Sequence, residues 1–167
     1  WTSAAPATSL VTGAAPGNLV FTLGITTALA NTDTLDITAS QAIWSGTGAT
    51  TCTATAAGSA NSAFTTATTS TSILRVSATG AIATGTFVLT CTNNIAVNGA
   101  AGAVTFDIVS TKDTTALTGQ TGYTITAATA LTWTSAATET SLVTGQAPGD
   151  LVFTLGITTA LANTDTL

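Results

Sequence analysis

The sequence predicts an all-β fold, an antiparallel sandwich of about seven or eight strands. Three observations support this prediction. Apolar residues alternate with polar ones over many short segments, turn-forming clusters separate these segments, and only 5% of the residues are charged while threonine and alanine are abundant. No segment has a helical apolar period, and the alanines are interleaved with β-branched threonines, which favour strands. We therefore expect little or no helix.

The alternation also predicts which side of each strand faces the core, because successive side chains of a strand point to opposite sides. The expected inward residues are, in chain order, Leu19, Phe21, Leu23 and Ile25; Leu35 and Ile37; Cys52 and Ala54; Leu74 and Val76; Phe87, Leu89 and Cys91; Val104, Phe106 and Ile108; Tyr123 and Ile125. The outward threonines are expected to keep the sheets soluble without charge.

Turn-forming clusters lie between these strands, at residues 15–18, 30–33, 93–94 and 98–99. The hydroxyl-rich stretch from Ser59 to Ser72 is expected to be a loop. Its candidate O-glycosylation sites are Thr65, Thr66, Thr68 and Thr69. An unmodified loop is the alternative, and N-glycans are not expected because no asparagine stands in an Asn-x-Ser/Thr sequon.

The chain contains an internal repeat. Residues 1–35 and 133–167 align without a gap and differ at four positions, Pro6/Thr138, Ala7/Glu139, Ala14/Gln146 and Asn18/Asp150. Their offset of 132 residues is the length of a domain, whereas solenoid units have about 20 to 50 residues. The sequence therefore predicts a tandem array, with 1–132 as one full repeat in arbitrary phase and 133–167 as the start of the next.

The two ends of the sequence support this interpretation, since it starts at Trp1 and stops in mid-pattern at Leu167. We expect any signal peptide or anchor to lie outside it. Segment 127–137 contains neither Gly nor Pro, so neighbouring repeats are expected to pack closely. One hypothesis is that Thr140 to Thr159 supplies strands to the preceding repeat; the alternative is an arbitrary cut in a periodic sequence.

Composition and charge exclude several functions. The net charge is −5 and Arg75 and Lys112 are the only basic residues, so we expect no nucleic-acid partner. Histidine is absent, and the acidic residues fall mostly in turns or at outward strand positions, so we expect no catalytic site and no cofactor. No apolar run reaches the about 18 residues that a membrane span needs, and we expect no membrane insertion of this segment.

The two cysteines, Cys52 and Cys91, lie on different expected strands. Their pairing in a disulfide would close a loop of about 40 residues and contribute on the order of 4 kcal/mol in the chain-entropy model. A disulfide favours an oxidising, extracellular setting. Two buried free thiols are the alternative. Metal binding by the two cysteines is a weaker alternative, because the chain has no further cysteine and no histidine to complete a tetrahedral site.

One weak candidate metal site consists of Asn31, Asp33 and Asp36, whose oxygens could bind Ca²⁺ near a module junction. Their spacing matches no complete calcium loop, and a turn stabilised by an Asx-type hydrogen bond of Asp33 is the alternative. Lys112 could form a Lys-Asn isopeptide crosslink, although a solvated turn lysine is the simpler interpretation.

The run LVFTLGITTALANTDTLDIT, residues 19–38, resembles the immunoglobulin-like repeats of large secreted microbial surface proteins. These are the Thr/Ala-rich arrays of protists and microalgae and the stalks of bacterial adhesins. The resemblance implies an immunoglobulin-like sandwich in a stalk, flagellar hair or surface filament. The antibody pattern does not apply, because Trp44 precedes Cys52 instead of lying between the cysteines.

We therefore expect a structural subunit of a secreted, extracellular or cell-surface filament. Its expected partners are neighbouring repeats, through strand exchange or lateral assembly into a fibre. An adhesin stalk whose binding head lies elsewhere is the alternative function. Ice binding is a weaker one, because Thr-x-Thr pairs such as Thr51/Thr53 and Thr124/Thr126 do not recur at a regular period.

Overall fold

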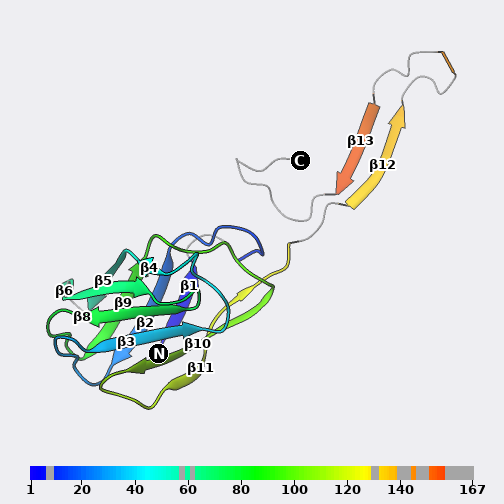
Figure 1. The fold of residues 1–167 in the computed structure, drawn as a ribbon. Helices are drawn as coiled ribbons and strands as arrows, with labels where there is room; N and C mark the ends of the chain where they lie inside the picture. Colours follow the sequence, from blue (N-terminus) through cyan, green and yellow to red (C-terminus); the bar gives the residue numbers. More distant parts are fainter. Residues whose placement is uncertain are drawn as a thin grey trace. The chain divides into compact units, whose positions relative to one another are not determined.

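Figure 1 shows a computed structural model of the chain, which describes residues 1–6, 10–56, 59–60, 63–128, 132–138, 144–145 and 151–156. The chain divides into two compact units, Trp1–Ala127 and Ala128–Leu167. All regular elements of the described residues are strands, so the all-β prediction is confirmed. Within the same residues, no helix is long and apolar enough to cross a membrane.

The described residues of the first unit form eleven strands. They are β1 (Ser3–Pro6), β2 (Leu19–Ile25), β3 (Thr34–Ala39), β4 (Gly48–Ala49), β5 (Cys52–Ala56), β6 (Ser59–Ala60), β7 (Phe64–Thr68), β8 (Ile73–Ala78), β9 (Gly85–Cys91), β10 (Gly102–Ser110) and β11 (Leu117–Ile125). The strands beyond those expected are β1, β4, β6 and β7. They are short and contain few large apolar side chains, which is why alternation did not reveal them.

Two antiparallel sheets pack face to face and confirm the predicted sandwich. Their strand orders are β1-β2-β9-β5-β6 and β11-β10-β3-β8-β7-β4. The ring of Phe21 in β2 meets the ring of Phe106 in β10 edge-on, with centroids 5.5 Å apart, so the two sheets are in contact through the core. Phe64 in β7 and Phe87 in β9 make a second such contact at 5.7 Å.

Seven of the strands are arranged as in the immunoglobulin sandwich, and further strands extend both sheets. β1, β2, β9 and β5 occupy the places of strands A, B, E and D, and β3, β10 and β11 those of C, F and G. These seven strands also follow one another in the immunoglobulin order, but β8, β7 and β4 extend the second sheet beyond β3, and β7 and β8 stand in the chain between the equivalents of D and E. The immunoglobulin-like type therefore stays a prediction.

The first unit begins and finishes at opposite ends of its sandwich. β1 and β2 are antiparallel, with Ser3 opposite Thr22, so Trp1 lies at the end where β2 finishes. β11 finishes at the other end, where Ile125 lies opposite Gly102 at the start of β10. A chain that passes through this unit thus runs from one end of the sandwich to the other.

The second unit contains β12 (Thr132–Thr138) and β13 (Leu151–Gly156), which pair with each other in a two-stranded antiparallel sheet. Ser135 lies opposite Thr154, as Ser3 lies opposite Thr22 in the first unit. The repeated sequence therefore forms the same strand pair in the same register in both copies. The strand pair as such was not predicted from the sequence, because β1 has almost no apolar pattern.

The environment of this strand pair differs between the two units. Phe21 is 0% exposed, whereas Phe153, its equivalent in β13, is 58% exposed. The sheets that cover Phe21 are formed by residues beyond the repeated segment, such as Phe106. The hypothesis that residues 140–159 supply strands to the preceding repeat stays a prediction, and most of these residues lie outside the described part of the chain.

Candidate functional site

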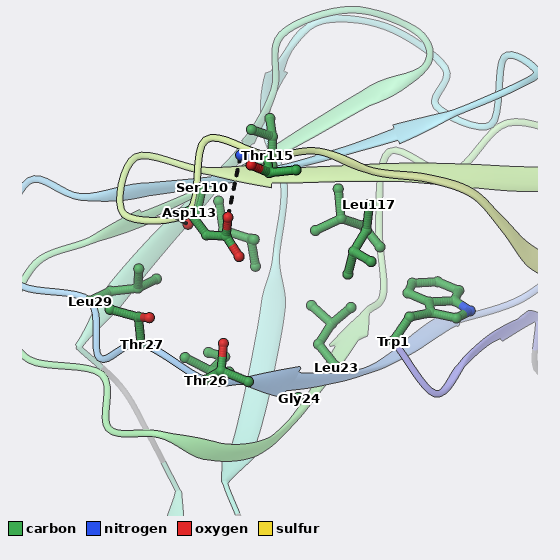
Figure 2. Close-up of a pocket in the computed structure, with 14 residues that line it drawn as sticks. Trp1, Leu23, Gly24, Thr26, Thr27, Leu29, Ser110, Asp113, Thr115 and Leu117 are labelled. Carbon is green, nitrogen blue, oxygen red and sulfur yellow. Dashed lines mark hydrogen bonds between the residues drawn. The ribbon is translucent and has the colours of Figure 1, made fainter.

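A cavity of about 190 Å³ lies in the first unit at the end of the sandwich where the chain begins (Figure 2). The end of β2, the start of β3, the end of β10 and the start of β11 form its walls. Most of the lining side chains are apolar, among them Trp1, Leu23, Ile25, Leu29, Leu35, Ile108 and Leu117. The sandwich is thus less completely filled at this end than at its centre.

Trp1 forms one side of the cavity and is held from two directions. Its indole Nε1 donates a hydrogen bond of 2.9 Å to the carbonyl oxygen of Thr121 in β11. Its ring lies 5.4 Å from that of Phe106, between centroids, at an interplanar angle of 30°. The tryptophan therefore bridges the edge of the sandwich between β1 and β11, and its position is determined by residues more than 100 apart in sequence.

Polar residues line the cavity at two places: Thr26 and Thr27 follow β2, and Ser110, Asp113 and Thr115 lie at the end of β10 and in the turn that leads to β11. Asp113 Oδ1 accepts a hydrogen bond of 3.3 Å from the backbone N–H of Thr115, drawn as a dashed line in Figure 2. The backbone N–H of Asp113 donates to Ser110 Oγ at 2.9 Å. These contacts stabilise the turn itself, and Asp113 supplies the only carboxylate among the lining residues. The cavity suits an apolar group, and its lining has no nucleophile paired with a base.

The predicted disulfide between Cys52 and Cys91 is confirmed. The S–S distance is 2.06 Å, and the two cysteines lie directly opposite each other on the neighbouring strands β5 and β9 of one sheet. The bond therefore fixes the register of an outer strand against a central one and does not join the two sheets. It lies outside the lining of the cavity.

The candidate calcium ligands Asn31, Asp33 and Asp36 are not brought together as a site. Asp33 Oδ2 accepts a hydrogen bond of 2.7 Å from the N–H of Ala30, which is the expected turn contact, and this bond lowers the pKa of Asp33. Lys112 Nζ lies 3.3 Å from the same oxygen. Among the described residues, no group of three His, Cys, Asp or Glu side chains could hold a metal ion.

Asp36 is engaged separately, by the guanidinium of Arg75 on the neighbouring strand β8. Arg75 Nε and Nη2 donate hydrogen bonds of 2.8 and 2.7 Å to its two carboxylate oxygens. These bonds raise the pKa of Arg75. The two aspartates that the sequence suggested as calcium ligands thus each neutralise a cation of the protein itself.

Three of the four candidate glycosylation sites, Thr65, Thr66 and Thr68, lie in β7, so the expectation of a loop was wrong for residues 64–68 and for residues 59–60, which form β6. Thr66 and Thr68 are buried, and their hydroxyls donate hydrogen bonds of 2.6 Å to the carbonyl oxygens of Thr50 and Gly46. Their hydroxyls are therefore not accessible to a glycosyltransferase. Thr65 and Thr69 are exposed, and their modification stays a prediction.

Neither the cavity nor a polar cluster around Asn94 could be predicted from the sequence. Asn94 Nδ2 donates hydrogen bonds to Thr68 Oγ1 at 2.8 Å and to the carbonyl oxygen of Gly46 at 3.1 Å. Asn94 also has a positive φ of 56°, which asparagine tolerates better than most residues. The Asn-Asn pair was correctly assigned to a turn, but its partners became visible only in the folded chain.

Comparisons with protein families, curated proteins and solved structures find no significant match to this chain.

Proposed function

We propose that this protein is a structural subunit of an extracellular filament or stalk, built from tandem disulfide-bonded sandwich modules. The observation that carries the proposal is the shared register of β1–β2 and β12–β13, because it makes the second copy the beginning of a second module of the same kind. In unit 1, the corresponding pair is completed by the strands that follow it in the chain.

The geometry of a single module supports the proposal. Its first strand begins at one end of the sandwich and its last strand finishes at the other, so successive modules can follow one another end to end. Beads joined in this way extend a chain, whereas modules with both termini at one end would cluster. The disulfide supports the extracellular setting, where such bonds persist.

The lining of the cavity and the partners of the aspartates also agree with a structural role. Asp33, Asp36 and Asp113 are all engaged in contacts that stabilise turns or neighbouring strands. A uniform spacer needs rigid, equivalent modules and no localised chemistry. A stalk that presents a binding head outside this chain would have the same modules, and the present proposal includes it as a variant.

The test is to measure how particle length depends on repeat number. Chains with one, two and four copies of residues 1–132 would be compared by small-angle scattering and negative-stain electron microscopy. β10 has nine residues, and a strand of that length spans roughly 30 Å. We expect the maximum dimension to grow by about 30 to 40 Å per added repeat. A dimension that levels off between two and four repeats would contradict the proposal.

A further inference from the structure

The two copies of the repeated strand pair differ in how far the pairing extends. In the first unit, β1 pairs with β2 from Ser3 opposite Thr22 onward, and the N–H of Thr2 donates to the carbonyl oxygen of Thr22. In the second unit, the pairing continues to Thr132 opposite Gly156. Thr132 comes before the tryptophan that begins the repeat, and Gly156 is the equivalent of Gly24.

The residue of β2 that corresponds to Gly156 is Gly24, and it lines the cavity. Leu23, Gly24 and Ile25, the last three residues of β2, all belong to its wall. Figure 2 shows Trp1 beside Leu23, at the place where an extension of β1 would continue along the end of β2. A segment that preceded Trp1 in the manner of Thr132 would therefore run past the cavity.

We propose that this cavity is a socket for the segment that joins one module to the next. Its occupant is the sequence Ala-Ala-Thr-Ala-Leu-Thr, which stands before Trp133 as residues 127–132 and would stand before Trp1 in a tandem array. The leucine of this segment, equivalent to Leu131, fills the cavity. The inference rests on the proposed array, since it assumes that a repeat precedes this one.

The leucine is the residue that the geometry selects. It stands two positions before the tryptophan, and side chains two apart on a strand point to the same side. Because Trp1 lines the cavity, the leucine would point toward it as well. The other five residues of the segment are alanine and threonine, so the leucine is its only large apolar side chain.

Size and polarity agree with this occupant. The cavity measures about 190 Å³, and an apolar cavity of about 150 Å³ accepts benzene in another protein. A leucine side chain therefore fits without displacing the walls. Asp113 is the only lining residue with a charged side chain, and its carboxylate is engaged by Thr115, so the side chains of the cavity have little to attract a charged ligand. A covalently attached segment also has a high effective concentration at the cavity.

The experiment compares three forms of the 167-residue chain: unextended, extended at the N-terminus by Ala-Ala-Thr-Ala-Leu-Thr, and extended by the same six residues with the leucine replaced by alanine. The alanine form is the matched control for the added length and for removal of the charged terminus from Trp1. Thermal unfolding of the first unit is followed by the NMR signals of Tyr123, the only tyrosine of the chain.

We expect the leucine extension to raise the Tm of the first unit by about 5 to 10 °C relative to the alanine form, from burial of one leucine. Amide exchange of residues 23–25 should slow in the same form. Benzene, used as a small apolar probe, should shift the Trp1 indole N–H signal in the unextended chain and not in the leucine form.

Equal Tm values for the leucine and alanine forms would overturn the inference, as would an undiminished benzene shift in the leucine form. The outcome is independent of the length measurement on concatenated repeats. If those chains lengthen and the leucine has no effect, the socket is wrong and the array stands. If the leucine stabilises the unit and concatenated chains do not lengthen, the filament proposal is wrong and the socket stands.

Discussion

Gly122 in β11 occupies a place in the sandwich that has no room for a side chain. It is the extra residue of a bulge, because Tyr123 lies opposite Val104 while Thr121 lies opposite Thr105. A Cβ atom at this position would overlap the ring of Phe106 and would approach the carbonyl oxygen of Val104 to 2.7 Å. The change Gly122→Ala must therefore move both a buried ring and the backbone of β10.

The expected cost of Gly122→Ala follows from this overlap. Forcing an extra carbon into a packed core typically costs about 1 to 3 kcal/mol. For a unit of this size, that corresponds to a fall in Tm of roughly 5 to 15 °C. The assay is urea denaturation of the full chain, followed by the NMR signals of Tyr123, with the m-value compared between variants to confirm that only stability has changed.

Gly24→Ala is the matched control, because Gly24 also lies in a strand of the first unit and its Cβ would meet no atom within 4 Å. We expect this change to be neutral or to stabilise by up to about 1 kcal/mol. Phe106→Leu provides a second check. In the double variant, the smaller side chain at position 106 should reduce the cost of Gly122→Ala, so that the two changes together destabilise by at least about 0.5 kcal/mol less than the sum of the single changes. Equal stabilities of the two alanine variants would refute the reasoning.

Three further predictions concern the core, the disulfide and pH. Phe21→Ala should destabilise the first unit by about 3 to 5 kcal/mol, because it removes a fully buried ring. Phe153→Ala, at the equivalent exposed position of the second unit, should leave the Tm of the first unit unchanged in calorimetry. Similar effects of the two changes would contradict the different environments of the two copies. Replacing Cys52 and Cys91 together by alanine should cost up to about 4 kcal/mol in denaturant titrations, and reduction of the parent chain should match it. Burial raises the pKa of Tyr123 to about 12. The unfolded chain therefore loses the phenol proton at a lower pH than the folded chain. The contribution of Tyr123 to the free energy of unfolding should be fully present below pH 10 and should fall by up to about 2 to 3 kcal/mol as the pH rises to 12. Tyr123→Phe should remove this component, and an unchanged pH profile in that variant would show that another group is responsible.

The strands with large apolar residues were predictable from sequence, because burial of one face imposes a period of two that can be read directly. In β2, Leu19, Phe21 and Leu23 are all buried, as the alternation required. The cysteine pair could likewise be predicted, since two cysteines in a chain of this composition favour a single bond. The turn at Asp33 was recognisable because an aspartate can accept a hydrogen bond from a backbone N–H of its own turn.

β7 was missed for a physical reason. Thr66 and Thr68 are polar in sequence, yet they are buried because Thr50 and Gly46 present carbonyl oxygens to their hydroxyls. Burial of a threonine hydroxyl costs less free energy where such partners are in place, and for Thr66 and Thr68 those partners come from segments about 20 residues away. No local pattern carries this information. The partners of Asn94 were hidden for the same reason.

The sequence by itself determined that the chain is a β-sandwich, that residues 133–167 are a near copy of residues 1–35 and that its cysteines pair, because periodicity, self-similarity and the number of cysteines are local or directly countable properties. Only the tertiary structure decided the order in which the chain visits the two sheets, the in-sheet position of the disulfide and the cavity beside Trp1. These features depend on which distant segments lie next to each other. The proposed socket depends on such a feature, because residues of β2, β3, β10 and β11 together form the cavity.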